Sequence, residues 1–136
     1  MHLLLPAELR SARTAARAAI DFDPAEGERL AIALTEIVTN IVRHGWRGCG
    51  SDRIQLELVR DDEQSLVATL RYPGLPFDWR PPARTAAAMI APLDLQGGLG
   101  LLVIHSFADD VSATSDGPMQ EVTIHRRLRT ALPRAA

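Results

Sequence analysis

The stretch Leu30–Gly45 reads LAIALTEIVTNIVRHG, and the rest of the chain is interpreted outward from it. Leu30, Leu34, Ile37 and Ile41 recur at helical spacing, and further apolar residues between them widen the stripe until it covers most of the circumference. A helix that is apolar on most of its sides is typical of a protein interior. We therefore predict that this segment is a buried helix.

Three polar residues, Glu36, Asn40 and His44, follow one another at intervals of four within this apolar segment. On a helix this spacing places them along one side, turn above turn. A buried carboxylate without a partner costs several kcal/mol or stays protonated. The line therefore predicts a site that faces a cation, a ligand or a water-filled cleft. From these three residues alone, the solvent-facing side of an amphipathic helix remains the alternative.

Length and composition indicate a single soluble domain spanning residues 1–136. The chain has 46% apolar and 24% charged residues, which is typical of a globular protein. Its net charge of −2, without a dense Lys/Arg block, gives nucleic-acid binding no electrostatic support. Cys49 is alone, and the start, MHLLLPAELR, is too short in apolar residues for a signal peptide or a membrane span. We expect a cytoplasmic protein whose tail, residues 129–136, is frayed.

The N-terminal segment predicts a short strand over Leu3–Leu5 and a helix over residues 7–20. Arg10, Arg13 and Arg17 line up on one side of that helix. Such a row is either a solvated face or a docking surface for an acidic partner.

The central helix has recognisable start and stop signals. Asp23 can cap free amide groups, Pro24 suits the first helical position, and Glu26 stands where a capping box has its acid. Gly45 can take the left-handed conformation that commonly ends a helix. We predict a helix of about twenty residues between these signals.

Alternating apolar residues predict strands over Arg53–Arg60 and Leu66–Tyr72, joined as a hairpin, and over Val111–Thr114 and Glu121–Leu128. Together they indicate an antiparallel sheet with one face covered by helices. Between the two pairs, residues 72–79 contain two prolines and a glycine, so they do not continue a strand. A further helix over residues 83–90 is the expectation for the segment that follows.

The segment Gly97–Phe107 reads GGLGLLVIHSF, a glycine-rich bend that leads into an apolar helix. Free backbone amides and the positive end of the helix dipole suit a phosphate there, and glycine lets an anion approach the main chain. A plain turn before a helix is the alternative.

Three segments in this order, EIVTNIVRHG from Glu36, GLPFD from Gly74 and GGLGLLVI from Gly97, resemble the ATP-binding fold of the GHKL superfamily. The resemblance is strongest to the stand-alone anti-sigma factor serine/threonine-protein kinases, which bind a sigma factor and a STAS-type antagonist. It implies the Bergerat-type α+β fold, a two-layer sandwich whose mixed, mainly antiparallel sheet is covered on one face by helices. It also implies ATP and Mg²⁺ as cofactors.

On the central helix, the resemblance implies that Glu36 is the catalytic acid that prepares the attacking hydroxyl. Asn40 would hold Mg²⁺, which bridges the phosphates. Arg43 and His44, one turn further on, would lie near the phosphates or at the rim of the cleft.

The other two motifs supply the remaining cofactor-binding positions that the resemblance implies. Gly74 and Phe77 match the second motif, beside the base. The third motif is matched by Gly98, Gly100 and Leu101, and residues 80–97 would form a lid over the nucleotide.

Two positions depart from the family pattern. Tyr72 stands where the family has an aspartate that hydrogen-bonds the exocyclic amine of adenine, and Gln120 or Glu121 stands where a threonine supports that aspartate. Loss of a charged hydrogen bond removes roughly 1.5–3 kcal/mol, or about one to two decades of affinity. Either another group reads the base, or nucleotide binding is weak.

The leading hypothesis is an anti-sigma regulator that binds ATP·Mg and phosphorylates a serine or threonine of an antagonist protein, thereby controlling sigma-factor availability and transcription. The alternative is a non-catalytic regulator that binds its partner and has a degenerate nucleotide site. A sensor histidine kinase is disfavoured, because no helical dimerisation segment with a phosphorylatable histidine precedes the domain. Homodimerisation through the first helix and the sheet edge is left open.

Overall fold

The computed structural model describes residues 1–62, 64–81 and 98–128. The expected helix over residues 83–90, most of the expected lid and the tail lie outside these residues. The elements follow one another as β1 (His2–Leu5), α1 (Ser11–Phe22), α2 (Gly27–Asn40), the π-helical turn η1 (Ile41–Gly45), β2 (Ile54–Asp61), β3 (Ser65–Pro73), α4 (Gly98–Phe107), β4 (Asp110–Asp116) and β5 (Met119–Arg127).

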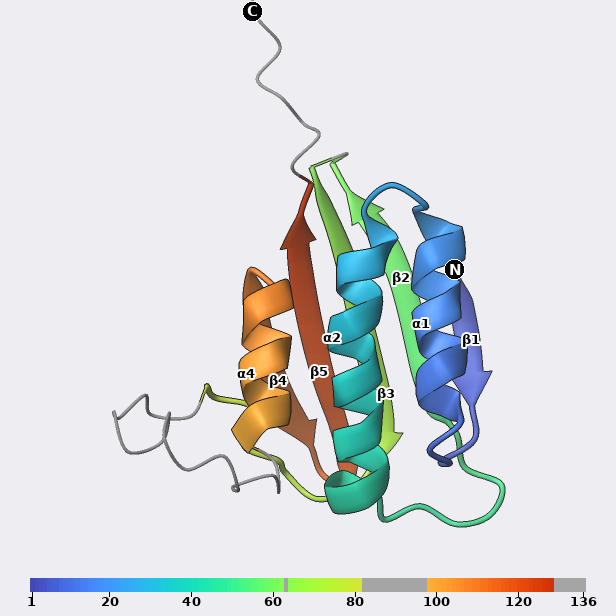
Figure 1. Ribbon diagram of the computed structural model, residues 1–136. Helices are drawn as coiled ribbons and strands as arrows, with labels where there is room; N and C mark the ends of the chain where they lie inside the picture. The colour runs from blue at the N-terminus through green and yellow to red at the C-terminus, as the bar shows by residue number, and fades with distance from the viewer. Residues whose placement is uncertain (63, 82–97, 129–136) are drawn as a thin grey trace, which may run out of the picture.

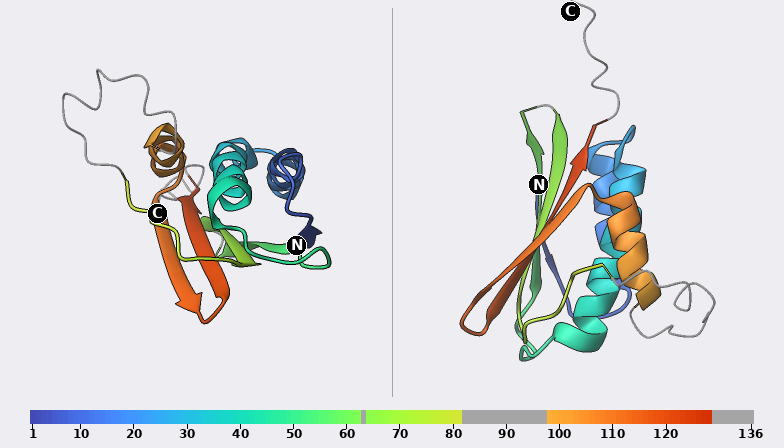
Figure 2. Two further views of the ribbon diagram at one scale, coloured as in Figure 1. Left: turned by 90° about the horizontal axis from the view of Figure 1, so that it is seen from below. Right: turned by 90° about the vertical axis from the view of Figure 1, so that its left-hand side faces the viewer.

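The five strands form one sheet in the order β1-β2-β3-β5-β4, and every neighbouring pair is antiparallel. Helices α1, α2 and α4 lie side by side on one face of this sheet, and the described part of the chain places no helix on the other face (Figures 1 and 2). The predicted two-layer α+β fold is confirmed. The described strand pairs contain no parallel neighbour, so this part of the sheet is antiparallel rather than mixed.

The core lies between the two layers and follows the alternation that the sequence predicted. In β2, Ile54, Leu56 and Leu58 are at most 1% exposed, while the residues between them point away from the helices. Burial of each such side chain contributes about 1.5–3 kcal/mol. From α2, the core receives Leu30, Leu34, Ile37 and Ile41, all 0% exposed.

Helix α1 begins later than predicted. Residues 7–10 form a turn, in which the Ser11 amide donates to the Glu8 carbonyl at 2.9 Å and the Ser11 hydroxyl donates to the Pro6 carbonyl at 2.6 Å. The side-chain bond to Pro6 fixes the turn and delays the helix. Close packing of α1 on α2 depends on a glycine, because a Cβ at Gly27 would lie 2.1 Å from the Ala19 carbonyl oxygen.

The predicted long central helix is observed as α2 followed by η1. At its start, Asp23 Oδ1 accepts hydrogen bonds from the amides of Ala25 and Glu26, as a capping residue does, although regular helix begins only at Gly27. Glu26 makes no side-chain capping bond, so the predicted capping box is not formed.

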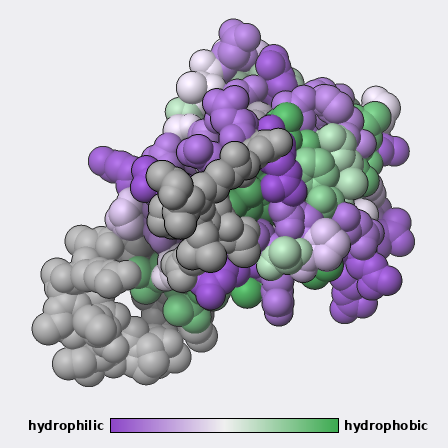
Figure 3. Space-filling model, turned by 90° about the horizontal axis from the view of Figure 1, so that it is seen from above, coloured by the Kyte–Doolittle hydropathy of each residue, from purple (hydrophilic) through white to green (hydrophobic). Residues whose placement is uncertain are grey.

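None of the described helices combines the length and the apolar character needed to cross a membrane. Viewed from the end of the β2–β3 hairpin, the described surface is mostly hydrophilic, with apolar residues gathered in limited areas (Figure 3). The glycine motif and the C-terminal end of α2 lie at the opposite end of the molecule (Figure 1).

Candidate functional site

The polar line lies on the side of α2 that faces α4. Glu36 is half-buried, and Asn40 is only 5% exposed. The regular α-helix ends at Asn40, before the polar line reaches His44. Beyond it, the Trp46 amide donates to the Ile41 carbonyl, five residues back, at 2.7 Å. This π-helical turn places Arg43 and His44 at the exposed end of the segment.

The first turn of α4 lies against the first two members of that line, Glu36 and Asn40. A Cβ at Gly100 would lie 3.0 Å from Glu36 Oε2 and 3.7 Å from Asn40 Nδ2. Only a glycine leaves this space free. The first and third sequence motifs therefore meet, and the N-terminal end of α4, where backbone amides lack helical partners, lies beside Glu36 and Asn40.

The Asn40 side chain is incomplete as a hydrogen-bonding group. Its Nδ2 is buried and has no hydrogen-bond partner among the described residues. Leaving such a donor unsatisfied costs about 1–3 kcal/mol. Structures keep such a donor when an acceptor on a ligand or a water completes it, so this part of the site fits the phosphate oxygens that the resemblance implies.

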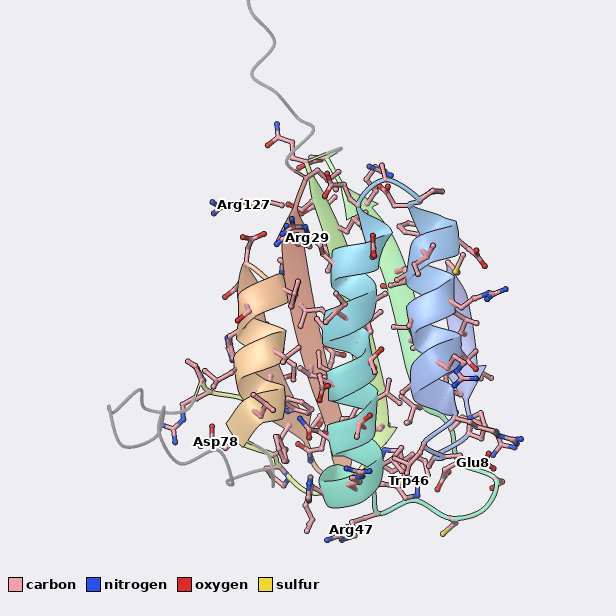
Figure 4. All side chains as sticks on the ribbon, viewed as in Figure 1. Glu8, Arg29, Trp46, Arg47, Asp78 and Arg127 are labelled. Carbon is pink, nitrogen blue, oxygen red and sulfur yellow. The ribbon has the colours of Figure 1, made fainter. Side chains whose placement is uncertain are left out.

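The second motif joins this end of α2 through a contact between two glycines. The Leu75 amide donates to the Gly45 carbonyl at 3.0 Å, and a Cβ at Gly74 would lie 2.2 Å from that same oxygen. In Figure 4, Trp46 lies beside η1 and Arg47 lies below it, while Asp78 lies beside the N-terminal end of α4. The segments after η1 and after β3 thus meet at one end of the sheet.

Tyr72 lies beneath this junction and is 0% exposed. Burial raises the pKa of its hydroxyl to about 12, a shift that the nearby Trp79 indole opposes only in part. By hydrogen-bond geometry the hydroxyl has no partner within the described ranges, so Trp79 is a neighbour rather than a bonded partner. Tyr72 is therefore a neutral phenol at every physiological pH, where the resemblance leads one to expect a carboxylate.

The structure decides between the two residues considered for the missing threonine. Gln120 pairs with Tyr72 across β3 and β5, is 4% exposed and donates from Nε2 to the Gly74 carbonyl at 3.1 Å. Its Oε1 accepts from the Ser115 hydroxyl. Glu121 belongs to the opposite face, where its Oε2 lies 3.9 Å from Arg71 Nη1.

Sequence reasoning named His44 and Phe77 as site residues but missed their contact with each other and the roles of Trp79 and His105 beside them. The rings of His44 and Phe77 are nearly parallel, at 24°, with centroids 6.2 Å apart, and Phe77 in turn packs on Trp79 at 4.5 Å. His105 of α4 shares a hydrogen bond of 2.6 Å between its Nε2 and the Trp79 carbonyl. The signal available in the sequence was the aromatic content of the stretch after Gly74.

The remaining predicted positions lie on α4. Gly98 is its first residue, and Leu101 is half-buried and packs against the core. Of the predicted site residues, the structure brings Glu36, Asn40 and Gly100 into contact, and groups Tyr72, Gly74, Phe77 and His44 at the adjoining end.

Comparisons place these features in context. A family model of the histidine kinase-like ATPase domain matches residues 4–126. The RsbU and RsbW domains of a Mycobacterium tuberculosis protein are similar in structure, with a TM-score of 0.66, 17% identity and coverage of 94% of this chain and 32% of that one. This chain thus spans about a third of that neighbour's length. No curated protein matches.

Two further solved structures resemble the chain. The SiaB–SiaC complex of Pseudomonas aeruginosa has a TM-score of 0.57 and 16% identity, covering 94% of this chain and 89% of that one. Full-length ShkA in complex with AMPPNP has a TM-score of 0.51 and 16% identity, covering 90% and 30%. At these identities the likeness shows the fold alone.

Proposed function

Because the chain belongs to the histidine kinase-like ATPase domain family, we propose that it binds ATP·Mg and phosphorylates a serine or threonine of a partner protein as an anti-sigma regulatory factor. The observation that carries this proposal is the buried amide nitrogen of Asn40, which lacks a hydrogen-bond partner among the described residues and lies against the first turn of α4. A ligand rich in acceptor oxygens at this point completes the amide.

Asn40, the first backbone amides of α4 and Glu36 would have different roles in phosphoryl transfer. When bound, ATP would supply the phosphoryl group and Mg²⁺ would neutralise its developing charge. Asn40 would hold the metal through its side-chain oxygen, and the first backbone amides of α4 would donate to phosphate oxygens. Glu36 would accept the proton of the attacking hydroxyl, whose oxygen then bonds to phosphorus as ADP leaves.

The proposed partners are a STAS-type antagonist and a sigma factor. Support comes from the structural likeness to SiaB, which was solved in complex with SiaC, and from the arginine row on α1. Arg13 and Arg17 are exposed, and Arg10 and Arg13 line a groove of about 550 Å³ between α1 and α2. A positive row beside a groove suits an acidic surface on a partner.

Calorimetric titration of ATP with Mg²⁺ tests the proposal. The wild type is expected to bind, and Asn40→Ala is expected to lose at least about tenfold in affinity. Thr39→Ala is the matched control, because Thr39 is the neighbouring residue on α2 and its hydroxyl bonds only the Thr35 carbonyl among the described residues. Absence of wild-type binding at millimolar ATP would refute a kinase.

A second candidate function is a non-catalytic regulator, and the observation that favours it is the buried neutral phenol of Tyr72. Reporter transcription in the native host separates the two. If the chain is a kinase, Glu36→Ala deregulates the reporter as deletion does. If it is a binding module, Glu36→Ala leaves regulation unchanged, whereas charge reversal at Arg10, Arg13 and Arg17 weakens it.

A further inference from the structure

Among the described residues at the base end of the site, the phenol, amide and carboxylate of Tyr72, Gln120 and Asp78 are each buried or already paired. Tyr72 is 0% exposed, so its hydroxyl does not reach a ligand in the conformation described. Gln120 is buried and its amide is engaged by Gly74 and Ser115. Asp78, the carboxylate of the second motif, is held by Arg80, which donates to its two oxygens at 2.9 and 2.8 Å.

What this end offers instead is a pair of accessible ring faces. His44 is exposed and Phe77 is half-buried, and their centroid separation of 6.2 Å exceeds the 4.5 Å of the packed Phe77–Trp79 pair. Stacked bases in a duplex lie ~3.4 Å apart, so two rings with a flat base between them lie ~6.8 Å apart. The 6.2 Å between the His44 and Phe77 rings is close to that distance. Trp79, itself 6% exposed and bonded to His105, holds Phe77 in place.

We propose that the chain binds purine nucleoside triphosphates without selecting adenine, and that the base stacks on the His44–Phe77 ring pair. The inference rests on the proposed function, because the phosphate end at Asn40 and α4 positions the ligand. Stacking tolerates any base, since every base has a π-face. Strong selection requires a polar group that a wrong base leaves unpaired, and none of Tyr72, Asp78 and Gln120 presents a polar group that is both accessible and free.

Equilibrium titrations of the wild type with ATP, GTP and tripolyphosphate, each with Mg²⁺, test the inference. ATP and GTP are expected to bind within about threefold of each other, and both more tightly than tripolyphosphate. A preference for ATP over GTP of about tenfold or more would overturn the inference and leave the proposed function standing. If neither nucleotide binds, the proposed function fails and the inference falls with it.

Variants then locate the base contact. Phe77→Ala and His44→Ala are each expected to weaken ATP and GTP alike, by about tenfold, and to leave tripolyphosphate binding unchanged. Leu75→Ala, in the same loop with a side chain 51% exposed, is the matched control and should change none of the three. Loss of tripolyphosphate binding in Phe77→Ala, or unchanged nucleotide binding in both ring variants, contradicts stacking.

Tyr72→Phe separates stacking from reading by the buried hydroxyl. It keeps the ring that packs against Gly45 and removes only the hydroxyl. The ratio of ATP to GTP affinity is expected to stay as in the wild type. A change in that ratio of about tenfold would show that Tyr72 reads the base and would overturn the proposal.

Discussion

Gly74 is the residue at which the second motif is tied to the end of α2. A Cβ there would lie 2.2 Å from the Gly45 carbonyl oxygen and 2.9 Å from the Tyr72 ring. Backbone and a buried ring cannot yield as a flexible side chain can. We therefore expect Gly74→Ala to lower the free energy of unfolding by at least about 1–3 kcal/mol.

Urea unfolding measures this effect, with Gly50→Ala as the matched control. A Cβ at Gly50 meets nothing within 4 Å, so its substitution should stay within about 0.5 kcal/mol of the wild type. Equal effects of the two substitutions would show that the glycine contact is not as tight as described.

Asp23 is a buried acid that is fully partnered. Oδ1 accepts from the amides of Ala25 and Glu26, and Oδ2 lies 2.5 Å from Arg60 Nη2. Burial raises the pKa of the carboxyl, but the hydrogen bonds and the Arg60 charge outweigh it, and the net pKa is lower than the ordinary 3.8. The ionised form therefore stabilises the fold.

The sign of the pH dependence follows from that lowered pKa. The contribution of Asp23 is fully present above the unfolded-state pKa near 3.8 and is lost as the pH falls through the lower folded-state pKa. Asp23→Asn should lower the free energy of unfolding by about 1–2 kcal/mol at neutral pH. The difference should be smaller in acid, where protonation of Asp23 removes the same stabilisation from the wild type. Urea unfolding at both pH values checks this, with the exposed Asp61→Asn as the control. A constant difference between Asp23→Asn and the wild type would contradict it.

At the scale of single residues, spacing alone predicted that Glu36 and Asn40 belong together, because periodicity is a local property. It could not choose between Gln120 and Glu121, since which of two adjacent strand residues faces the site depends on the register with β3. Nor could it find the bond between His105 and Trp79, which joins residues 26 apart in sequence.

Among the elements, α4 is where stability and function are expected to oppose each other. Gly100 lies in a helix, where Ala is favoured by about 1 kcal/mol, and its nearest neighbour is the end of the flexible Glu36 side chain at 3.0 Å. Gly100→Ala should therefore fold at least as well as the wild type and bind ATP·Mg about tenfold more weakly, because the added methyl fills space beside Glu36 and Asn40.

Thermal unfolding and calorimetry on the same protein sample measure both quantities. Leu99→Ala, at an exposed neighbouring position of α4, is the control for ATP affinity. Unaltered ATP affinity in Gly100→Ala would mean that the ligand does not occupy the space beside Glu36.

The elements themselves were largely predictable, and their ends were not. Alternation placed β2 and β3 to within a residue or two, but the end of the central helix was read as a simple glycine stop. The observed π-helical turn depends on the bond from Trp46 to Ile41, which in turn accompanies the pairing of Trp46 with Gly74. The residues around Trp46 alone do not predict its pairing with Gly74, at the end of a strand far along the chain.

On the scale of the whole molecule, the two-layer arrangement followed from one apolar face per strand and apolar helices to cover it. The order β1-β2-β3-β5-β4 did not, because it rests on pairings between segments far apart in the chain, such as β3 with β5. The family resemblance supplied what local patterns could not, namely that the first and third motifs meet.

A ligand that binds only the folded chain must raise its global stability. At a concentration of ATP·Mg 100 times its dissociation constant, the free energy of unfolding should rise by about 2.7 kcal/mol in the wild type. Asn40→Ala should show much less of this gain, while its ligand-free stability should not fall, since the substitution removes a buried donor that makes no hydrogen bond with the described residues. Equal stabilisation of both proteins by ATP·Mg would show that Asn40 does not contribute to the binding site.

The side-chain amide signals of Asn40 in a ¹⁵N–¹H NMR titration give the most direct test of a nucleotide site on α2. These signals are identified by their absence in Asn40→Ala. Addition of ATP with Mg²⁺ is predicted to shift them together with the backbone amides at the start of α4. Saturating ATP·Mg that leaves both sets of signals in place would contradict the assignment of this site.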